Sequence, residues 1–260
     1  MKKIVFLGGK QIGYKCLQCL CKEKEIEIVL AISNMSDLYD SEDRWYPKIH
    51  ELAGQHSIPY MATDDINSDK MVAKIHSISP DFMFVVYYDN ILSQKIFSQA
   101  KEGTINLHLA DAEKYRGCYP TTYAIINGET EYGVTLHYID EGVDSGDIID
   151  KEVFELQKEW TGKDLYRAAT EKGYELFKRN IKNIISGNLK RRVQKSPAHI
   201  SYYKRSQFPS HEITFEGKAG ETLNRIRALL FSPFPPPYFY LGDKKFIIVE
   251  ARESSEKEGQ

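Results

Sequence analysis

The segment 81–88, with the sequence DFMFVVYY, restricts the fold of this chain more than any other. It has the length of a β-strand, and its apolar residues lack the alternation expected of a strand with one face in water. Such a strand has to be covered on both faces, as at the centre of a parallel sheet with helices on either side. The segment therefore predicts a doubly wound, Rossmann-like α/β fold with a mostly parallel sheet.

The beginning of the chain is consistent with this fold. Residues 2–7 read as an apolar strand, Gly8 and Gly9 as a turn, and residues 12–24 as a helix. The dinucleotide-binding fingerprint fails, because Lys10 stands where a glycine must let the backbone approach a pyrophosphate. Lys10 is either a phosphate contact at a helix N-terminus or a solvated turn lysine. Further strands are predicted over 27–32, 60–62, 104–109, 134–139 and 151–155, and further helices over 47–55, 67–77, 89–100, 119–127 and 162–186.

The length of 260 residues suits one substantial domain with a small appendage. We predict a main domain over residues 1–190, a small α+β module over 198–251 and a disordered tail over 252–260. Within the module we expect a strand over 211–215, a helix over 221–230 and a final β-hairpin that turns at Gly242 and Asp243.

The charge and the cysteines bear on the class of protein. A formal net charge of −2 gives no general attraction to nucleic acid, and no apolar run is long enough for a signal-peptide core or a membrane span. We therefore expect a cytoplasmic protein that binds neither nucleic acid nor membrane. Cys16, Cys19 and Cys21 lie in one predicted helix without a second ligand pair at zinc-finger spacing, so we predict reduced core thiols and no metal site.

Candidate catalytic residues lie between residues 103 and 150. Asn106 and His108 are two apart on a predicted strand, so their side chains share a face. An amide donor and an imidazole together suit a reaction that develops an oxyanion. Asp144, on the acidic loop after the strand 134–139, could orient or charge His108. For the Asn-x-His tripeptide alone, a satisfied polar pair on a buried strand is the commoner interpretation.

Several motifs in this region occur together and in order. They are Asn106-x-His108, Tyr115-Arg116-Gly117, Gly133-x-Thr135-x-His137 and Asp144-x-Gly146-x-Ile148. Together they resemble the formyltransferase family that uses N10-formyltetrahydrofolate, which includes glycinamide ribonucleotide transformylase, methionyl-tRNA formyltransferase and nucleotide-sugar N-formyltransferases. The resemblance implies that Asn106, His108 and Asp144 are catalytic. The chain departs from the family over residues 109–114, where a small residue or proline and a Leu-Pro pair are usual, so the loop there is expected to differ in shape.

The resemblance also implies a folate pocket. In a doubly wound sheet, ligands bind beyond the carboxyl ends of the strands, where residues 87–92, His108 and the loop 140–144 should gather. Apolar side chains and backbone groups there would recognise a flat pterin. The predicted contacts to N10-formyltetrahydrofolate are Tyr87, Tyr88, Ile91, Leu92, Ile139, Asp140 and Gly142.

The segment 226–249 resembles the C-terminal module of nucleotide-sugar N-formyltransferases, in which an Arg-Ala-Leu helix precedes a turn rich in proline and aromatic residues. Prolines preset a rigid turn, and clustered aromatic rings offer a stacking surface for a base. Alternatively, these rings join the module to the main domain, and Trp45 with Tyr46 forms a hydrophobic staple for the next helix. The predicted substrate contacts are Lys10, Trp45, Tyr46, Tyr115, Arg116, Phe231, Phe234 and Tyr238.

The function that the resemblance implies is transfer of a formyl group to the amine of a nucleotide-linked 3- or 4-amino-dideoxyhexose. It further implies thymidine diphosphate as the nucleotide, with uridine diphosphate as the alternative, a homodimer, and a bacterial role in surface polysaccharide synthesis. Methionyl-tRNA formyltransferase resembles a longer chain, and glycinamide ribonucleotide transformylase a shorter one. A folate hydrolase would need no nucleotide platform, and a folate-binding module without transferase activity would not need the Asn-His-Asp set.

Overall fold

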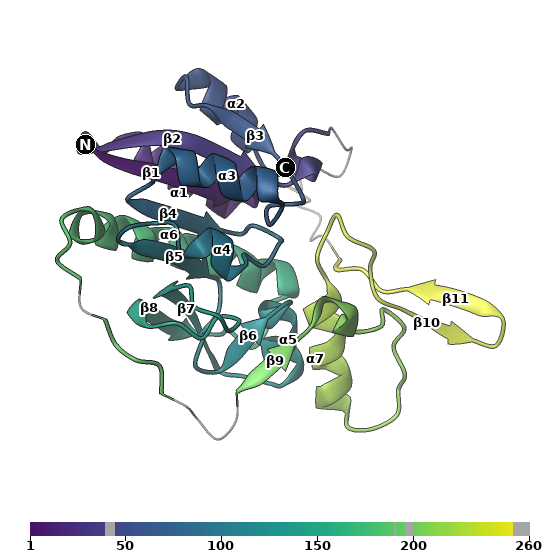
Figure 1. Ribbon diagram of the computed structural model, residues 1–260. Coiled ribbons are helices and arrows are strands. Elements are labelled where there is room, and N and C mark those ends of the chain that lie inside the picture. The colour runs from purple at the N-terminus through teal and green to yellow at the C-terminus, as the bar shows by residue number, and fades with distance from the viewer. Residues whose placement is uncertain (40–44, 190, 196–199, 252–260) are drawn as a thin grey trace, which may run out of the picture.

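A computed structural model describes residues 1–39, 45–189, 191–195 and 200–251 (Figure 1). The described residues contain a seven-stranded sheet in the order β3-β2-β1-β4-β5-β7-β8. The first five strands in this order are parallel, and β7 and β8 join the edge in antiparallel fashion. The strands are β1 (Lys2–Gly8), β2 (Ile26–Ser33), β3 (Tyr60–Ala62), β4 (Phe82–Val86), β5 (Gly103–His108), β7 (Glu131–Tyr138) and β8 (Ile148–Glu155). The predicted mostly parallel α/β fold is confirmed.

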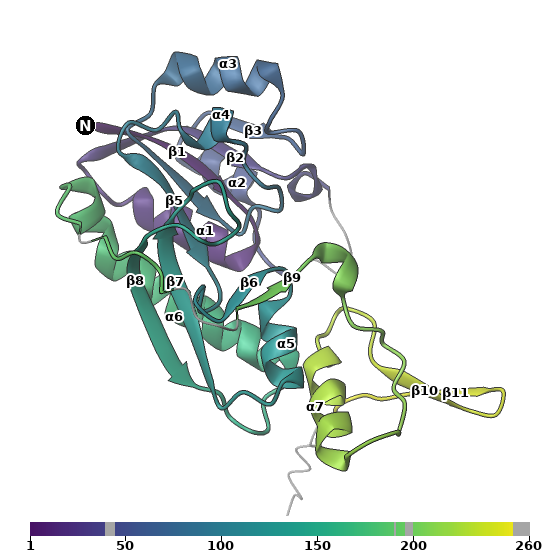
Figure 2. The same ribbon diagram turned by 60° about the horizontal axis from the view of Figure 1, so that its bottom comes forward.

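The central strand β4 is buried along its whole length. Phe82, Phe84 and Val86 point into one core cluster, and Met83 and Val85 into another on the opposite face. The first cluster lies under α1 (Lys10–Leu20), α2 (Ile49–Gln55) and α6 (Gly162–Ile185), and the second under α3 (Asp69–Ile78) and α4 (Gln94–Phe97) (Figures 1 and 2). This two-sided burial explains why DFMFVVYY shows no polar alternation.

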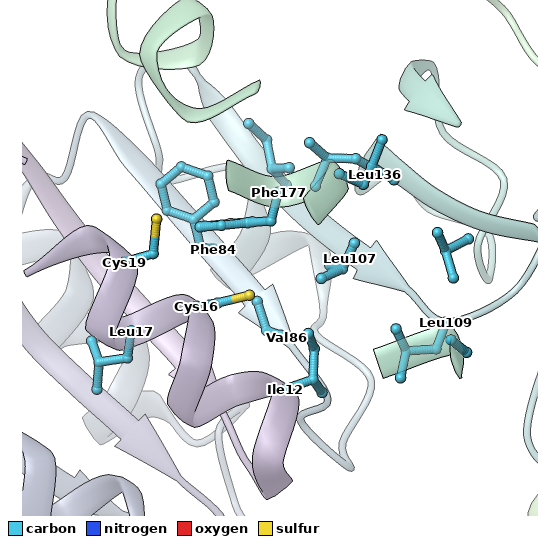
Figure 3. Packing of buried hydrophobic residues seen from close by; sticks show 14 of the residues in the cluster. Ile12, Cys16, Leu17, Cys19, Phe84, Val86, Leu107, Leu109, Leu136 and Phe177 are labelled. Carbon is cyan, nitrogen blue, oxygen red and sulfur yellow. The ribbon is translucent and has the colours of Figure 1, made fainter. Parts of the chain in front are cut away.

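Helices α1 and α6 cover the same face of the sheet. Figure 3 shows Cys16 and Ile12 of α1 beside Val86, and Phe177 of α6 beside Phe84, whose ring it meets edge-on at a centroid distance of 5.4 Å. Cys16 and Cys19 are buried in this core, as predicted, and burial raises the pKa of both thiols. Cys21, also predicted as a core residue of the helix, follows the end of α1 and is only partly buried against the cluster. Helix α6 begins at a capping box, in which Thr161 Oγ1 accepts from the Asp164 amide and Asp164 Oδ2 accepts from the Thr161 amide.

The C-terminal part carries a helix and a hairpin. They are α7 (Ala219–Leu229), which packs against α5 (Pro120–Ile126), and the antiparallel pair β10 (Tyr238–Leu241) and β11 (Lys244–Ile247), which projects away from the rest (Figure 2). The predicted hairpin turn is confirmed, with Gly242 at φ +58°. The tail 252–260 and residues 190 and 196–198 of the predicted boundary lie outside the described residues.

Some predicted elements were wrong. The strand over 211–215 is absent, and only one parallel bridge joins Glu212 to Tyr238. Pro235, Pro236 and Pro237 precede Tyr238 and have no N–H, so this ladder cannot extend to the residues before Tyr238. The helix over 89–100 is reduced to the short α4, and α1 begins and ends earlier than 12–24.

An unpredicted pair of strands lies beside the sheet. β6 (Tyr115–Gly117) runs parallel to β9 (Ser201–Tyr203), which is followed by the 3-10 helix η2 (Arg205–Gln207). Another 3-10 helix, η1 (Met35–Asp37), follows β2. The β6–β9 pair brings residues after 200 next to the motif Tyr115-Arg116-Gly117, so the two distant parts of the chain share one surface.

Candidate active site

A cavity of about 540 Å³ lies at the carboxyl ends of β4 and β5, where a doubly wound sheet binds its ligands. One wall comes from the chain after β4 and after β7, and the opposite wall from the β6–α5 connection and from β9. The lining residues are 85, 87–92, 106–109, 117–120, 137, 139–144 and 202–205.

Asn106, His108 and Asp144 meet at the floor of this cavity. Asn106 Nδ2 donates a hydrogen bond to Asp144 Oδ1 at 3.1 Å. His108 Nδ1 lies 3.6 Å from the same oxygen. His108 Nε2 lies 3.0 Å from the Tyr115 carbonyl oxygen, and because a carbonyl only accepts, Nε2 carries a proton. Nδ1 is therefore the imidazole nitrogen that faces the carboxylate.

His137 is a further member of this cluster. It stands opposite Asn106 in the antiparallel register of β5 and β7, with Nε2 3.1 Å from Asn106 Nδ2 and 3.5 Å from Asp144 Oδ1. Its Nδ1 lies 2.7 Å from the Tyr138 carbonyl oxygen and so carries a proton. His137 is not among the residues predicted for the site, although the motif Gly133-x-Thr135-x-His137 and strand alternation together would have placed it on this face.

Asp144 is held as an anion. Its side chain is only 12% exposed, and its Oδ2 accepts a hydrogen bond from the Gly117 amide at 2.9 Å. Burial alone would raise the pKa of this carboxyl, but the proximity of His108, the contact with His137 and the hydrogen bond from the Gly117 amide together hold the pKa well below its ordinary value. Asp144 also has φ +50°, in the left-handed region that residues other than glycine rarely adopt.

Gly117 is required by the same geometry. Its φ is +80°, and a Cβ atom there would lie 2.4 Å from the carbonyl oxygen of Tyr203. Only glycine lets β6 approach β9 this closely while its amide reaches Asp144. The β6–β9 pair thus contributes directly to the position of the carboxylate.

The residues predicted to contact folate all line the cavity. Leu92 is buried and Ile91 is 69% exposed, so this wall offers apolar surface at different depths. Asp140 Oδ1 accepts hydrogen bonds from the Gly142 amide and from Ser145 Oγ, which closes the loop after β7 into a turn. Tyr88 directs its hydroxyl to the Thr63 carbonyl oxygen and away from the cavity.

The residues predicted to contact the substrate do not lie on the walls of this cavity. Lys10 donates to the Tyr46 hydroxyl at 2.8 Å, and the pair lines a small neighbouring hollow with Tyr87 and Asp89. Tyr115 is buried and donates its hydroxyl to Glu129. Arg116 donates to the Ala112 carbonyl oxygen and to Gln194.

The predicted aromatic contacts pack against each other. The Trp45 ring lies 5.5 Å from Tyr166 of α6 and 6.0 Å from Phe231, and Phe231 lies 5.3 Å from Phe234. This arrangement fits the alternative interpretation, in which the rings join the C-terminal residues to the main sheet. Tyr238 lies on β10, with Lys245 Nζ 3.6 Å from its ring centroid.

Part of the cavity wall was not predicted at all. Cys118 and Tyr119, and residues 202–205 of the Tyr-Tyr-Lys-Arg run, face the cavity because β9 pairs with β6. The run is visible in the sequence, but nothing local indicates its partner. Within the described residues, no set of three or more His, Cys, Asp or Glu side chains could hold a metal ion, and no helix is long and apolar enough to cross a membrane.

Comparison with known proteins identifies a family that the sequence matches. A family model described as "Formyl transferase" matches residues 1–181. Among curated proteins, the bifunctional polymyxin resistance protein ArnA of Wigglesworthia glossinidia brevipalpis is 31% identical over 256 residues, which are 98% of this chain and 38% of that protein. The chain thus spans well under half the length of this relative.

Solved structures share the fold across nearly the whole chain. The N-formyltransferase from Helicobacter canadensis, solved with folinic acid and dTDP-3-aminofucose, is 26% identical with a TM-score of 0.74, covering 93% of this chain and 85% of that one. WlaRD, a sugar 3N-formyl transferase solved with dTDP and 5-N-formyl-THF, is 28% identical with a TM-score of 0.73, covering 91% and 82%. A 4-N formyltransferase from Francisella tularensis is 19% identical with a TM-score of 0.78, covering 96% and 97%, and shows the fold alone.

Proposed function

The chain belongs to the formyl transferase family, and we propose that it transfers a formyl group from N10-formyltetrahydrofolate to the amine of a dTDP-linked 3- or 4-amino-dideoxyhexose. The observation that carries this proposal is the cluster of Asn106, His108 and Asp144 at the floor of a large cavity in such a chain. The Helicobacter protein and WlaRD, solved with dTDP ligands and formylated folates, support the choice of both substrates.

The cavity suits a folate on its β4–β7 side. Its volume of about 540 Å³ lies within the range of small-molecule sites in proteins. The chain over 87–92 and 139–144 presents apolar side chains together with peptide groups, and a flat heterocycle needs both. When bound, the formylated folate supplies an electrophilic formyl carbon attached to N10.

The residues at the floor have complementary roles in the transfer. The substrate amine, in its neutral form, bonds to the formyl carbon, and the carbon–N10 bond breaks. Asn106 and His108 stabilise the oxyanion that develops on the formyl oxygen, and for this one of the hydrogen bonds that their N–H groups make to Asp144, His137 or the Tyr115 carbonyl oxygen is exchanged for one to the substrate. Asp144 keeps His108 oriented and charged, and the pair carries a proton from the attacking nitrogen to N10. The products are the N-formylated sugar and tetrahydrofolate.

The test is a substrate panel with purified full-length protein and N10-formyltetrahydrofolate. The acceptors are dTDP-linked 3-amino- and 4-amino-dideoxyhexoses, their uridine diphosphate counterparts and methionyl-tRNA, with product mass and tetrahydrofolate release as readouts. We expect one added formyl group on a dTDP-aminosugar, with the 3-amino sugars favoured because WlaRD is a 3N-formyl transferase. Formylation of methionyl-tRNA alone would contradict the proposal.

The acceptor enters along the wall formed by residues 117–120 and 202–205. Lys204 and Arg205 are the only lysine and arginine among the described lining residues, so the diphosphate of the acceptor binds there. Arg205 lies 3.5 Å from Asp89 and is 66% exposed, which leaves it room to reorient. We expect the double variant Lys204→Ala/Arg205→Ala to raise KM for the nucleotide sugar at least about ten-fold, because even one hydrogen bond to a charged group contributes about 1.5 kcal/mol.

The matched control is Lys218→Ala on the surface near α7, whose side chain is 88% exposed. Steady-state kinetics with each substrate varied in turn measure the effect. KM for N10-formyltetrahydrofolate should stay within about two-fold of wild type, a change in binding free energy of under about 0.5 kcal/mol. A rise in that constant instead would show that these cations bind the folate carboxylates.

The protein acts as a homodimer in the bacterial cytoplasm, where folates and nucleotide sugars are available, and its product enters cell-surface polysaccharide synthesis. The hairpin β10–β11 supports the dimer, because Leu241, Ile247 and Val249 are 60–71% exposed on and beside it. Sedimentation velocity should give a dimer for the wild type and a monomer for Ile247→Glu. A monomeric wild type would contradict this assembly.

A further inference from the structure

We infer that Gln194 is a positioning residue for Asp144, so that this one side chain supports the active site although it lies beyond the residues that match the family model. The role of Asp144 rests on the proposed function. The position of its loop is a separate property that can be measured without turnover.

The side-chain amide of Gln194 bonds both to the Asp144 loop and to Arg116. Its Nε2 donates to the carbonyl oxygen of Asp144 at 2.9 Å and to that of Gly146 at 2.8 Å. Its Oε1 accepts from the Arg116 guanidinium at 2.7 Å. Two carbonyl oxygens require the amino group and a guanidinium requires the oxygen, so chemistry fixes the orientation of the amide.

Arg116 makes this contact rigid. Its Nε donates to the Ala112 carbonyl oxygen at 3.0 Å, and it stands next to Gly117, whose amide binds Asp144 Oδ2. Asp144 is thus held through its side chain by Gly117 and through its main chain by Gln194. These contacts maintain its left-handed backbone, which an aspartate otherwise adopts at a cost in free energy.

The segment that presents Gln194 is itself anchored on both sides. The Arg192 main chain exchanges hydrogen bonds with Ile148 at 2.7 and 2.9 Å, and the Arg192 guanidinium lies 2.7 Å from Glu113 Oε1. The Lys195 amide donates to Glu113 Oε1 at 2.7 Å. The hydrogen bond from Arg192, then that from Lys195, lower the pKa of Glu113 to about 2 against burial, so the anchor is ionised at neutral pH.

Within residues 191–195, Gln194 is the side chain that is not exposed. Its neighbour Val193 is 76% exposed and provides a matched control on the same stretch of backbone. A comparison of variants at the two positions therefore distinguishes the effect of losing the Gln194 amide from that of a general loosening of residues 191–195.

The experiment compares Gln194→Met, which keeps the length of the side chain but not its hydrogen bonds, with Val193→Ala in the full chain. Loss of two hydrogen bonds to the loop should lower kcat about 10- to 30-fold. KM for both substrates should hardly change. The same change in an Asp144→Asn background should give no further loss, because Gln194 acts through the carboxylate.

Hydrogen exchange of residues 140–147 provides a readout that does not need activity. Exchange should be faster in Gln194→Met and unchanged in Val193→Ala. Unchanged exchange together with wild-type kcat, or a further loss in the Asp144→Asn background equal to that in the wild type, would overturn the inference. Faster exchange in a protein that formylates no nucleotide sugar would instead refute the proposed function and leave the positioning of the loop intact.

Discussion

Asn106→Ala is expected to lower kcat about 100- to 1000-fold, the usual effect of removing one donor from an oxyanion site. Among the described residues, the side-chain amide of Asn106 bonds only to Asp144 and His137 at the cavity floor, so its removal should leave the sheet intact. KM for either substrate should change little, because the interaction strengthens as charge develops on the formyl oxygen. Product formation under saturating substrates measures the effect.

Asn188→Ala, an exposed position after α6, is the matched control and should behave as wild type. Near-ultraviolet circular dichroism should be the same for all three proteins. Turnover of Asn106→Ala within about three-fold of wild type, a loss under 1 kcal/mol, would mean that this amide does not bind the oxyanion.

Asp144→Asn is expected to lower kcat by about 1000-fold or more, because a neutral amide cannot stabilise a positive charge on the adjacent imidazole. Since the proximity of His108, the contact with His137 and the hydrogen bond from the Gly117 amide hold the pKa of Asp144 below its ordinary value, this residue is ionised across the working pH range. The fall in kcat should therefore be nearly the same at every pH between about 6 and 9, a range well above the ordinary aspartate pKa.

The same pKa has a consequence for stability. A carboxyl whose pKa is lowered on folding stabilises the native state above its unfolded pKa, and the contribution is lost as pH falls through the folded value. The stability advantage of wild type over Asp144→Asn should thus be complete at neutral pH and should shrink below about pH 4, the unfolded aspartate value. Urea unfolding at several pH values measures it. If Asp144→Asn lost activity only at acid pH, the assignment of Asp144 as a carboxylate that is ionised throughout this range would be contradicted.

Local pattern was enough to predict most of the sheet and the meeting of Asn106, His108 and Asp144 at one site. The unbroken apolar run 81–88 required cover on both faces, and Phe84 and Val85 do point into opposite cores. The spacing of Asn106 and His108 placed both on one face of β5, and their common approach to Asp144 followed from the loop after β7.

The missing parts depend on contacts between distant segments. Tyr203 reaches the cavity only because β9 pairs with β6, and three-residue strands carry no signal that identifies a partner. Gln194 lies in a short polar stretch whose role comes entirely from the loop it touches. Trp45 and Phe231 illustrate the opposite case, because an aromatic residue that could stack on a ligand can equally pack on Tyr166.

The anchoring of Gln194 beyond residue 181 also bears on how such enzymes exchange parts. A chimera that keeps residues 1–181 and takes everything after them from another protein would retain the sheet and the side chains of Asn106, His108 and Asp144, yet the loop of Asp144 would lack a fixed support. A functional crossover point lies after Lys195, because the retained part then still includes the contacts of Arg192 and Lys195 with Glu113 and that of Gln194 with the loop. Arg116 of β6 donates a hydrogen bond to Gln194, so the two residues would have to be inherited together and form one unit of recombination.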